Sequence, residues 1–312
     1  MKSKIISLGI LLFLYSMFCI GQTTSEKLLN QKALFNEDAL LQHIKVLSSD
    51  AFEGRRTGTK GGIKAKQYII NQFQKLNVKP LGTSFEQDFS FTSRGKTYNA
   101  VNVLGLVKGT EFPDSYIVIS AHYDHEGIQK GEIYNGADDD ASGISALFSF
   151  AEHLKDNLPK HSVILAAFDS EELGLKGSQH YVKHSIIPFR SIMMNINMDM
   201  ISRSDENELF AVGTRFNETL KRLILNSKTP KKLSLLTGHD GGDGKENWTY
   251  SSDHSSFHKR GIPFLYFGVS DHKDYHRPTD DFENIHPEFF KEAVNVIISV
   301  FNKVDAIQLK KE

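Results

Sequence analysis

Acidic and histidine side chains recur at the ends of successive apolar runs in this chain. Imidazole nitrogens and carboxylate oxygens are the ligands with which proteins hold zinc when no thiolate is present. Two imidazoles and three carboxylates suit two zinc ions that share one carboxylate, and an additional glutamate can serve as a base. This combination predicts metal-assisted hydrolysis of an amide bond. The candidates are His122 and Asp124 in AHYDH, Asp139 in NGADDDASG, the adjacent Glu171 and Glu172, Asp199 in NMDM, and His276 in DYHRPTDD.

His122 and Asp124 lie two residues apart at the end of an apolar run. In a strand, residues with this spacing face the same side. We therefore expect Asp124 to brace the ring of His122, as a carboxylate typically does behind a metal-bound imidazole. The alternative is a surface loop, since the chain contains 13 histidines, and the neighbouring His125 is expected to be a bystander.

Three consecutive aspartates, residues 138–140, lie between small residues. Adjacent carboxylates repel one another, so burying them together requires a cation, and small neighbours allow the backbone to approach closely. The alternative is a solvated helix start, because aspartate is favourable at a helix N-terminus. That alternative explains Asp140 well, but it does not explain the whole run after a strand that ends in histidine.

Glu171 and Glu172 follow another apolar run. Neighbouring side chains diverge, so one glutamate can bind metal while the other faces the attacking water. Zinc lowers the pKa of water to roughly 7, and a nearby carboxylate can then take its proton. The alternative is again a helix N-terminus, which favours acidic residues.

Asp199 and His276 complete the set. Asp199 ends a stretch that contains Met193, Met194 and Met198, and an acid there is costly unless it is paired or binds metal. His276 precedes Arg277 and Pro278 in a loop that proline can hold in place, although a histidine in a polar loop is usually a surface residue.

The candidate residues must be positioned by strands and helices, and along the chain short apolar runs alternate with amphipathic helix patterns. The runs at 100–106, 116–121, 163–168, 192–197 and 263–267 read as buried strands, and helical spacing is seen near 65–76, 144–154, 216–223 and 290–301. Buried strands that alternate with helices predict an α/β fold, a three-layer α/β/α sandwich around a mixed, mostly parallel central sheet. Ligand sites in such folds form beyond the carboxyl ends of strands, which is where the candidates lie.

The bulk composition is that of a globular protein. The chain has 312 residues, 39% hydrophobic and 24% charged, with a formal net charge of -1, so neither nucleic acid nor an anionic membrane is indicated as a partner. We predict one catalytic domain over residues 22–312, with an N-terminal helical extension at about residues 25–80.

The first 21 residues have the pattern of a secretory signal peptide. Lys2 and Lys4 precede an apolar run at 5–20, followed by Gly21. The run is short for a membrane span, which needs about 20 residues, and this favours a signal peptide over the alternative of an uncleaved membrane anchor. No stable membrane association is expected after cleavage. The only cysteine, Cys19, lies in this segment, and the mature protein would therefore hold zinc without thiolates. We expect an exported protein, either periplasmic or secreted.

In this order, the motifs resemble those of the M28 zinc aminopeptidases, exopeptidases with two co-catalytic zinc ions. The matching segments are AHYDH, YNGADDDASG, FDSEELGLKGS, NMDM and DYHRPTDD, with SDHSSF at residues 252–257 in addition. Each segment alone is moderately specific, whereas five in order are strong, and together they extend over about residues 40–305.

The resemblance implies a role for each matching residue. His122 and Asp199 would hold one zinc ion, Glu172 and His276 the other, and Asp139 would bridge the two. Glu171 would be the general base and acid, and Asp124 the carboxylate behind His122. The implied substrates are peptides with a free N-terminus, cleaved at the first peptide bond.

Two other functions compete with this interpretation. A glutaminyl cyclase is an acyltransferase on the same fold that uses a single zinc ion, and the apparently complete ligand set favours two metals instead. A binding domain without activity would be expected to lack Glu171 or a ligand, and none is missing. The motifs leave the preferred N-terminal residue and the oligomeric state open.

Overall fold

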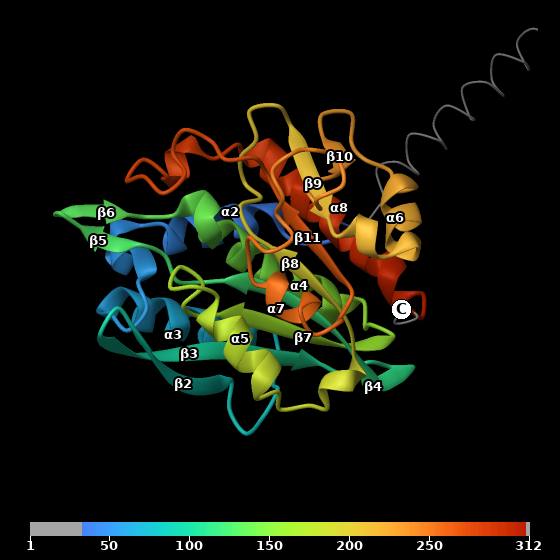
Figure 1. Ribbon diagram of the computed structural model, residues 1–312, viewed down its shortest axis with the longest axis horizontal. Coiled ribbons are helices and arrows are strands. Elements are labelled where there is room, and N and C mark those ends of the chain that lie inside the picture. The colour runs from blue at the N-terminus through green and yellow to red at the C-terminus, as the bar shows by residue number, and fades with distance from the viewer. Residues whose placement is uncertain (1–32, 310–312) are drawn as a thin grey trace, which may run out of the picture. The chain divides into compact units, whose positions relative to one another are not determined.

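A mixed sheet of nine strands lies at the centre of the fold, with the strand order β1-β3-β7-β4-β8-β11-β9-β10 and β2 paired to β3 (Figure 1). The strands are β1 (Lys79–Pro80), β2 (Glu86–Ser93), β3 (Lys96–Val107), β4 (Phe112–His122), β7 (His161–Phe168), β8 (Ile192–Met198), β9 (Glu208–Val212), β10 (Ser234–Thr237) and β11 (Phe264–Gly268). The computed structural model describes residues 33–309, so the predicted signal segment 1–21 and Cys19 lie outside the described residues.

Strands β7, β4, β8 and β11 are parallel neighbours at the middle of the sheet. Every residue of β7 and β8 is buried, which explains why both appear in the sequence as continuous apolar runs. The antiparallel pairs β3–β7 and β9–β11 flank this group. The five predicted strands correspond to β3, β4, β7, β8 and β11, and the predicted mixed sheet is confirmed.

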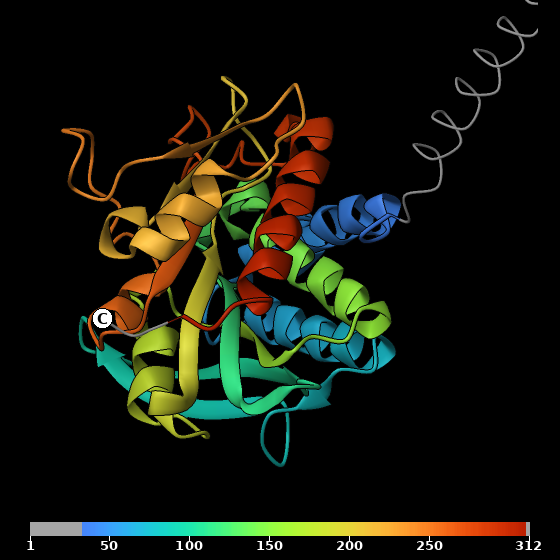
Figure 2. The ribbon, with the colours of Figure 1, turned by 90° about the vertical axis from the view of Figure 1, so that its right-hand side faces the viewer.

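Helices cover both faces of the sheet, as predicted for a three-layer α/β/α fold (Figure 2). On one face α2 (Glu37–Leu47), α3 (Lys60–Lys75), α4 (Ser142–Asp156) and α8 (Pro287–Asp305) pack together. On the other face α5 (Lys176–Lys183) packs against α7 (His254–His258). Helix α6 (Glu218–Leu225) contacts β10 and α8. None of the helices within residues 33–309 is both long enough and apolar enough to cross a membrane.

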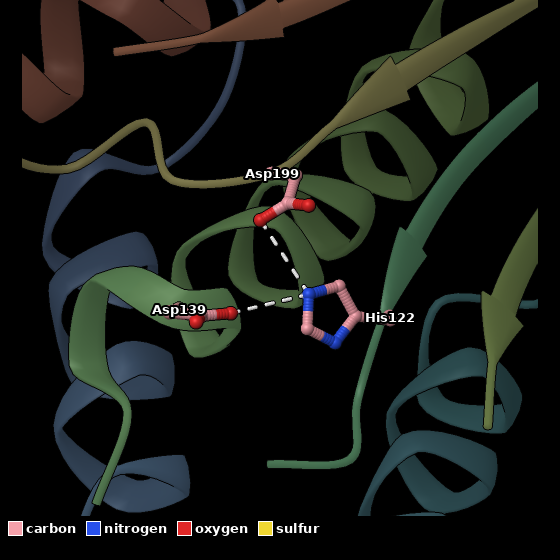
Figure 3. Close-up of side chains that lie close together, drawn as sticks. All are labelled: His122, Asp139 and Asp199. Carbon is pink, nitrogen blue, oxygen red and sulfur yellow. Dashed lines mark ion pairs between the residues drawn. The ribbon is translucent and has the colours of Figure 1, made fainter. Parts of the chain in front are cut away.

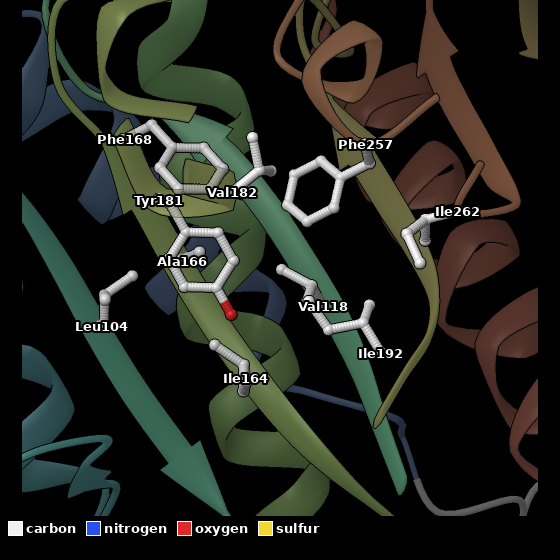
Figure 4. Close-up of a cluster of buried hydrophobic side chains, with 10 residues drawn as sticks. All are labelled: Leu104, Val118, Ile164, Ala166, Phe168, Tyr181, Val182, Ile192, Phe257 and Ile262. Carbon is white, nitrogen blue, oxygen red and sulfur yellow. The ribbon is translucent and has the colours of Figure 1, made fainter. Parts of the chain in front are cut away.

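A cluster of buried side chains joins the sheet to α5 and α7 (Figure 4). Ile164, Ala166 and Phe168 point to the same side of β7 because they alternate along the strand, and they meet Tyr181 of α5 and Phe257 of α7. Burial of one such large side chain contributes roughly 1.5–3 kcal/mol. This packing fixes the carboxyl end of β7, beyond which the chain turns toward Glu171.

Short elements connect the layers on the side where the candidate residues lie. A small hairpin of β5 (Gly127–Gln129) and β6 (Glu132–Tyr134) follows β4 and leads into the turn Ala137–Ala141 before α4. A helical turn at Asp50–Arg55 precedes α3, and further single turns occur at Phe189–Ser191, Thr214–Phe216 and Phe282–Asn284.

Candidate metal centre

The candidate side chains gather at the carboxyl ends of the central parallel strands. His122 is the last residue of β4, Asp199 follows β8 directly, and Glu171 and Glu172 lie just beyond β7. Asp139 comes from the turn before α4, and His276 from the loop after β11. All six line one cavity of about 350 Å³.

His122, Asp139 and Asp199 form the first group of possible ligands (Figure 3). Nε2 of His122 lies 3.2 Å from Oδ1 of Asp139 and 3.4 Å from Oδ1 of Asp199. Their ligand atoms all lie within 4.8 Å of one another, and all three residues are buried. Nitrogen and oxygen atoms that converge in this way suit a zinc ion, whose ligand distances are about 2.0–2.2 Å.

His276 and Glu172 form a second group around the other oxygen of Asp139. Nε2 of His276 lies 3.0 Å from Oδ2 of Asp139 and 3.4 Å from Oε2 of Glu172. The two oxygens of Asp139 therefore face different histidines, which is the arrangement that a carboxylate shared by two metal ions requires.

His125, which was expected to be a bystander, lies beside the second group. Its ring is fully buried, and Nδ1 lies 2.8 Å from Oε1 of Glu172 and 3.7 Å from Oδ2 of Asp139. Strand β4 ends at His122, so the alternation of a strand no longer governs the direction of the side chains that follow. The position of His125 is recognised from its full burial beside Glu172 and Asp139, and neither feature can be seen in the sequence.

The contact between Asp124 and His122 differs in detail from the expected one. Nδ1 of His122 lies 3.0 Å from the backbone oxygen of Asp124 and 3.8 Å from its carboxylate Oδ1. Asp124 is buried, and the carboxylate accepts a hydrogen bond of 2.9 Å from the backbone amide of Glu171. Asp124 thus supports the ring mainly through its backbone carbonyl, while its side chain orders the segment that carries Glu171.

The two adjacent glutamates have opposite pKa shifts. Burial, together with the negative charges of Asp199 and Asp253, holds the pKa of Glu171 well above its usual range. Burial also acts to raise the pKa of Glu172, but contacts with His125 and His276 outweigh it and lower this pKa to about 2. Two carboxyl groups whose pKa values are pushed apart are suited to different tasks, one to proton transfer and the other to a charged contact.

Asp138 and Asp140, the neighbours of Asp139, are engaged elsewhere. The backbone amide and the hydroxyl of Ser202 donate to Oδ1 of Asp138 at 2.6 and 2.7 Å. Asp140 accepts a hydrogen bond of 2.8 Å from the amide of Gly143, in the first turn of α4, as the helix-start alternative expected. Within the run of three aspartates, only Asp139 faces both histidine groups.

This chain is similar to curated proteins in sequence and to solved structures in fold. Aminopeptidase YwaD of Bacillus subtilis is 31% identical over 209 residues, which is 63% of this chain and 43% of that protein. The chain matches less than two thirds of the length of the first curated relatives, from 31% to 57%.

Two solved structures show a similar fold at low sequence identity. BSAP, a zinc aminopeptidase from Bacillus subtilis, matches with a TM-score of 0.70 and 19% identity over 88% of this chain and 96% of that chain. A glutaminyl cyclase from Porphyromonas gingivalis matches with a TM-score of 0.71 and 15% identity over 88% of this chain and 100% of that chain. At these identities the similarity concerns the fold alone.

The model of the family described as Peptidase family M28 matches residues 102–301, which include every candidate ligand and Glu171. The chain belongs to peptidase family M28.

Proposed function

We propose that this chain is a zinc aminopeptidase that hydrolyses the first peptide bond of peptides with a free N-terminus. The observation that carries the proposal is the position of Asp139, whose Oδ1 lies 3.2 Å from His122 and whose Oδ2 lies 3.0 Å from His276. In this proposal His122, Asp139 and Asp199 hold one zinc ion, and Asp139, Glu172 and His276 hold a second. The similarity to aminopeptidase YwaD supports the same activity.

Glu171 is the proposed general base and acid. Bound zinc would supply a Lewis acid for the scissile carbonyl and a lower pKa for the attacking water. Glu171 lines the cavity beside both ligand groups, and its raised pKa allows it to take a proton and to hold it. It would take the proton of the attacking water and donate it to the departing amine, so that the new N-terminus leaves uncharged.

The cavity itself supports an exopeptidase. Its volume is about 350 Å³, and Trp248, Tyr250 and Tyr275 form part of its wall. This space suits a single residue of the substrate, and the acidic groups around it attract the positive charge of a free amino terminus. An acetylated N-terminus lacks this charge and should not be accepted.

A glutaminyl cyclase is the second candidate because its fold is equally similar, with a TM-score of 0.71. A cyclase with a single zinc ion does not require a carboxylate whose two oxygens face two different histidines. The arrangement of Asp139 therefore favours the peptidase.

We also propose that the protein is exported, with residues 1–21 as a cleaved signal peptide. Expression of the full chain in a Gram-negative bacterium, followed by mass spectrometry of the cell fractions, tests this. The expected product is a periplasmic protein that begins near residue 22. An intact N-terminus in the membrane fraction would instead indicate an anchor.

The activity is tested with a pair of short peptides that differ only in N-terminal acetylation. Release of the first amino acid from the free peptide, but not from the acetylated one, is expected. Cleavage of both peptides would exclude an aminopeptidase. If neither is cleaved while a glutamine-initiated peptide forms pyroglutamate, the cyclase is the correct function.

A further inference from the structure

Arg55 is a fully buried cation in the turn that precedes α3, outside the segment matched by the family model. Its guanidinium group donates five hydrogen bonds, and all of the acceptors are backbone carbonyl oxygens. They are those of Tyr123 at 2.9 Å from Nε, Leu47 at 3.0 Å and Asn135 at 2.6 Å from Nη1, and Gly136 at 2.9 Å and Asp139 at 3.4 Å from Nη2.

These acceptors connect the segment that carries His122 with the segment that carries Asp139. Tyr123 follows His122 directly, and the carbonyls of Gly136 and Asp139 belong to the turn that presents the bridging carboxylate. The guanidinium is planar and its donors have fixed directions, so one side chain sets the spacing of both backbones. The distance from His122 to Asp139 is therefore determined in part by a residue that is remote from both in sequence.

The surroundings of Arg55 also suit a positive charge. Burial lowers the pKa of Arg55, and the nearby negative charges of Asp139 and Asp140 act against this shift. An arginine remains charged under these conditions. It partly offsets the repulsion between the aspartates before any metal is bound.

Thr57, two residues further on, makes a similar connection to the segment of Glu171. Its hydroxyl is buried, donates to Oδ1 of Asp169 at 2.7 Å, and lies 3.3 Å from Oδ2 of Asp124. The other oxygen of Asp124 accepts the amide of Glu171 at 2.9 Å. Thr57 thus binds the carboxylate of Asp169, two residues before the proposed base, and its hydroxyl oxygen lies 3.1 Å from that of Ser170, the residue between them.

We propose that Arg55 and Thr57 are positioning residues of the metal centre. Arg55 sets the relative positions of His122 and Asp139, and Thr57 sets the position of Glu171 through Asp169, which lies two residues before it. Neither residue lines the cavity of the candidate centre. The inference rests on the proposed zinc peptidase function, and it assigns a role to a segment outside residues 102–301, the part of the chain that the family model matches.

The test compares zinc affinity, kcat, KM and the melting temperature of the metal-free protein in variants of the full chain. Arg55→Lys keeps the charge but cannot form the planar set of five bonds, and we expect zinc affinity to fall about 10–100-fold, as for other outer partners of metal ligands. Lys64→Gln removes a charge from the following helix, where Lys64 donates to the backbone oxygen of Ala51, and should leave zinc affinity unchanged.

The second pair is Thr57→Val and Thr57→Ser. Thr57→Val replaces the hydroxyl with a methyl group of similar size, and we expect kcat to fall about 10-fold with little change in KM or zinc affinity. Thr57→Ser restores the hydroxyl and should restore kcat. If Arg55→Lys does not fold, this pair still decides whether the segment positions Glu171.

Several results would overturn the inference. One is a lower melting temperature in Arg55→Lys with unchanged zinc affinity and kcat, because that describes a structural role alone. Another is equal kcat in Thr57→Val and Thr57→Ser. If the wild-type protein binds zinc and cleaves peptides, and the variants have the same zinc affinity and kcat, the inference is contradicted but the proposed function is not. Wild-type protein that binds no zinc would contradict both.

Discussion

The backbone amide of Glu171 donates a hydrogen bond of 2.9 Å to Oδ1 of Asp124. The same oxygen lies 3.8 Å from Nδ1 of His122, and the backbone oxygen of Asp124 lies 3.0 Å from that nitrogen. Asp124 therefore connects a proposed zinc ligand with the proposed base. A change at this residue should affect both the metal and the proton transfer.

Substitution of Asp124 tests this connection. Asp124→Leu leaves the amide of Glu171 without its acceptor, and we expect kcat/KM to fall about 10–100-fold. Both variants keep the backbone carbonyl, but Asp124→Asn also keeps one side-chain oxygen as an acceptor, so its loss should be smaller. Steady-state kinetics with a short peptide measure both, and equal activity in the two variants would rule out the role of the side chain.

Substitution of Glu171 separates catalysis from metal binding. Glu171→Gln cannot transfer a proton, so kcat should fall about 10²–10⁴-fold while the zinc content is unchanged. Glu172→Gln is the matched control, because the same change one residue later should instead reduce the zinc content. Near wild-type turnover in Glu171→Gln would show that another group is the base.

Asp139→Asn should weaken both zinc sites, because one carboxylate contributes an oxygen to each. The loss of affinity should exceed the roughly 10–100-fold effect of outer-partner substitutions. Asp138→Asn is the control, since Asp138 contacts Ser202 and His272 rather than the histidines of the cluster. Isothermal titration calorimetry with zinc measures the affinity of both sites. If Asp139→Asn loses one zinc ion and binds the other as tightly as the wild type, Asp139 does not bridge the two ions.

His254 should make the fold sensitive to acid. Its buried ring stacks on Tyr266 with 4.5 Å between the ring centroids, Nε2 lies 2.9 Å from the backbone oxygen of Trp248, and burial chiefly lowers its pKa to about 3. The unfolded chain binds a proton below about pH 6.5 and the folded chain does not, so stability falls as the pH decreases from about 6.5 toward 3.

His254→Gln tests this contribution. Urea unfolding of the metal-free wild type and variant at pH 7.5, 6.0 and 5.0 gives the difference in the free energy of unfolding. The advantage of the wild type should shrink by up to about 1.4 kcal/mol per pH unit below pH 6.5. A difference that does not change with pH would show that His254 does not titrate in this way.

The central strands and the residues that follow them could be predicted from the sequence. Strands β7 and β8 are buried throughout, so they appear as apolar runs, and Asp199 is conspicuous because it directly follows one of them. Strand β2 was not predicted, because this outer strand is largely polar and only partly buried.

Contacts between distant segments could not be predicted in the same way. Arg55 bonds to Tyr123, 68 residues away, and to Gly136, 81 residues away, and no local pattern encodes such a pairing. The direction of the His125 side chain could not be predicted either, because β4 ends at His122 and the alternation of a strand does not extend to residue 125.

The zinc content of the purified wild-type protein tests the central claim most directly. The protein should be stripped of metal, saturated with zinc and separated from free metal. Its zinc content per chain is then measured by inductively coupled plasma mass spectrometry. The proposed centre, with Asp139 between His122 and His276, predicts two zinc ions per chain. One ion or none per folded chain would contradict it.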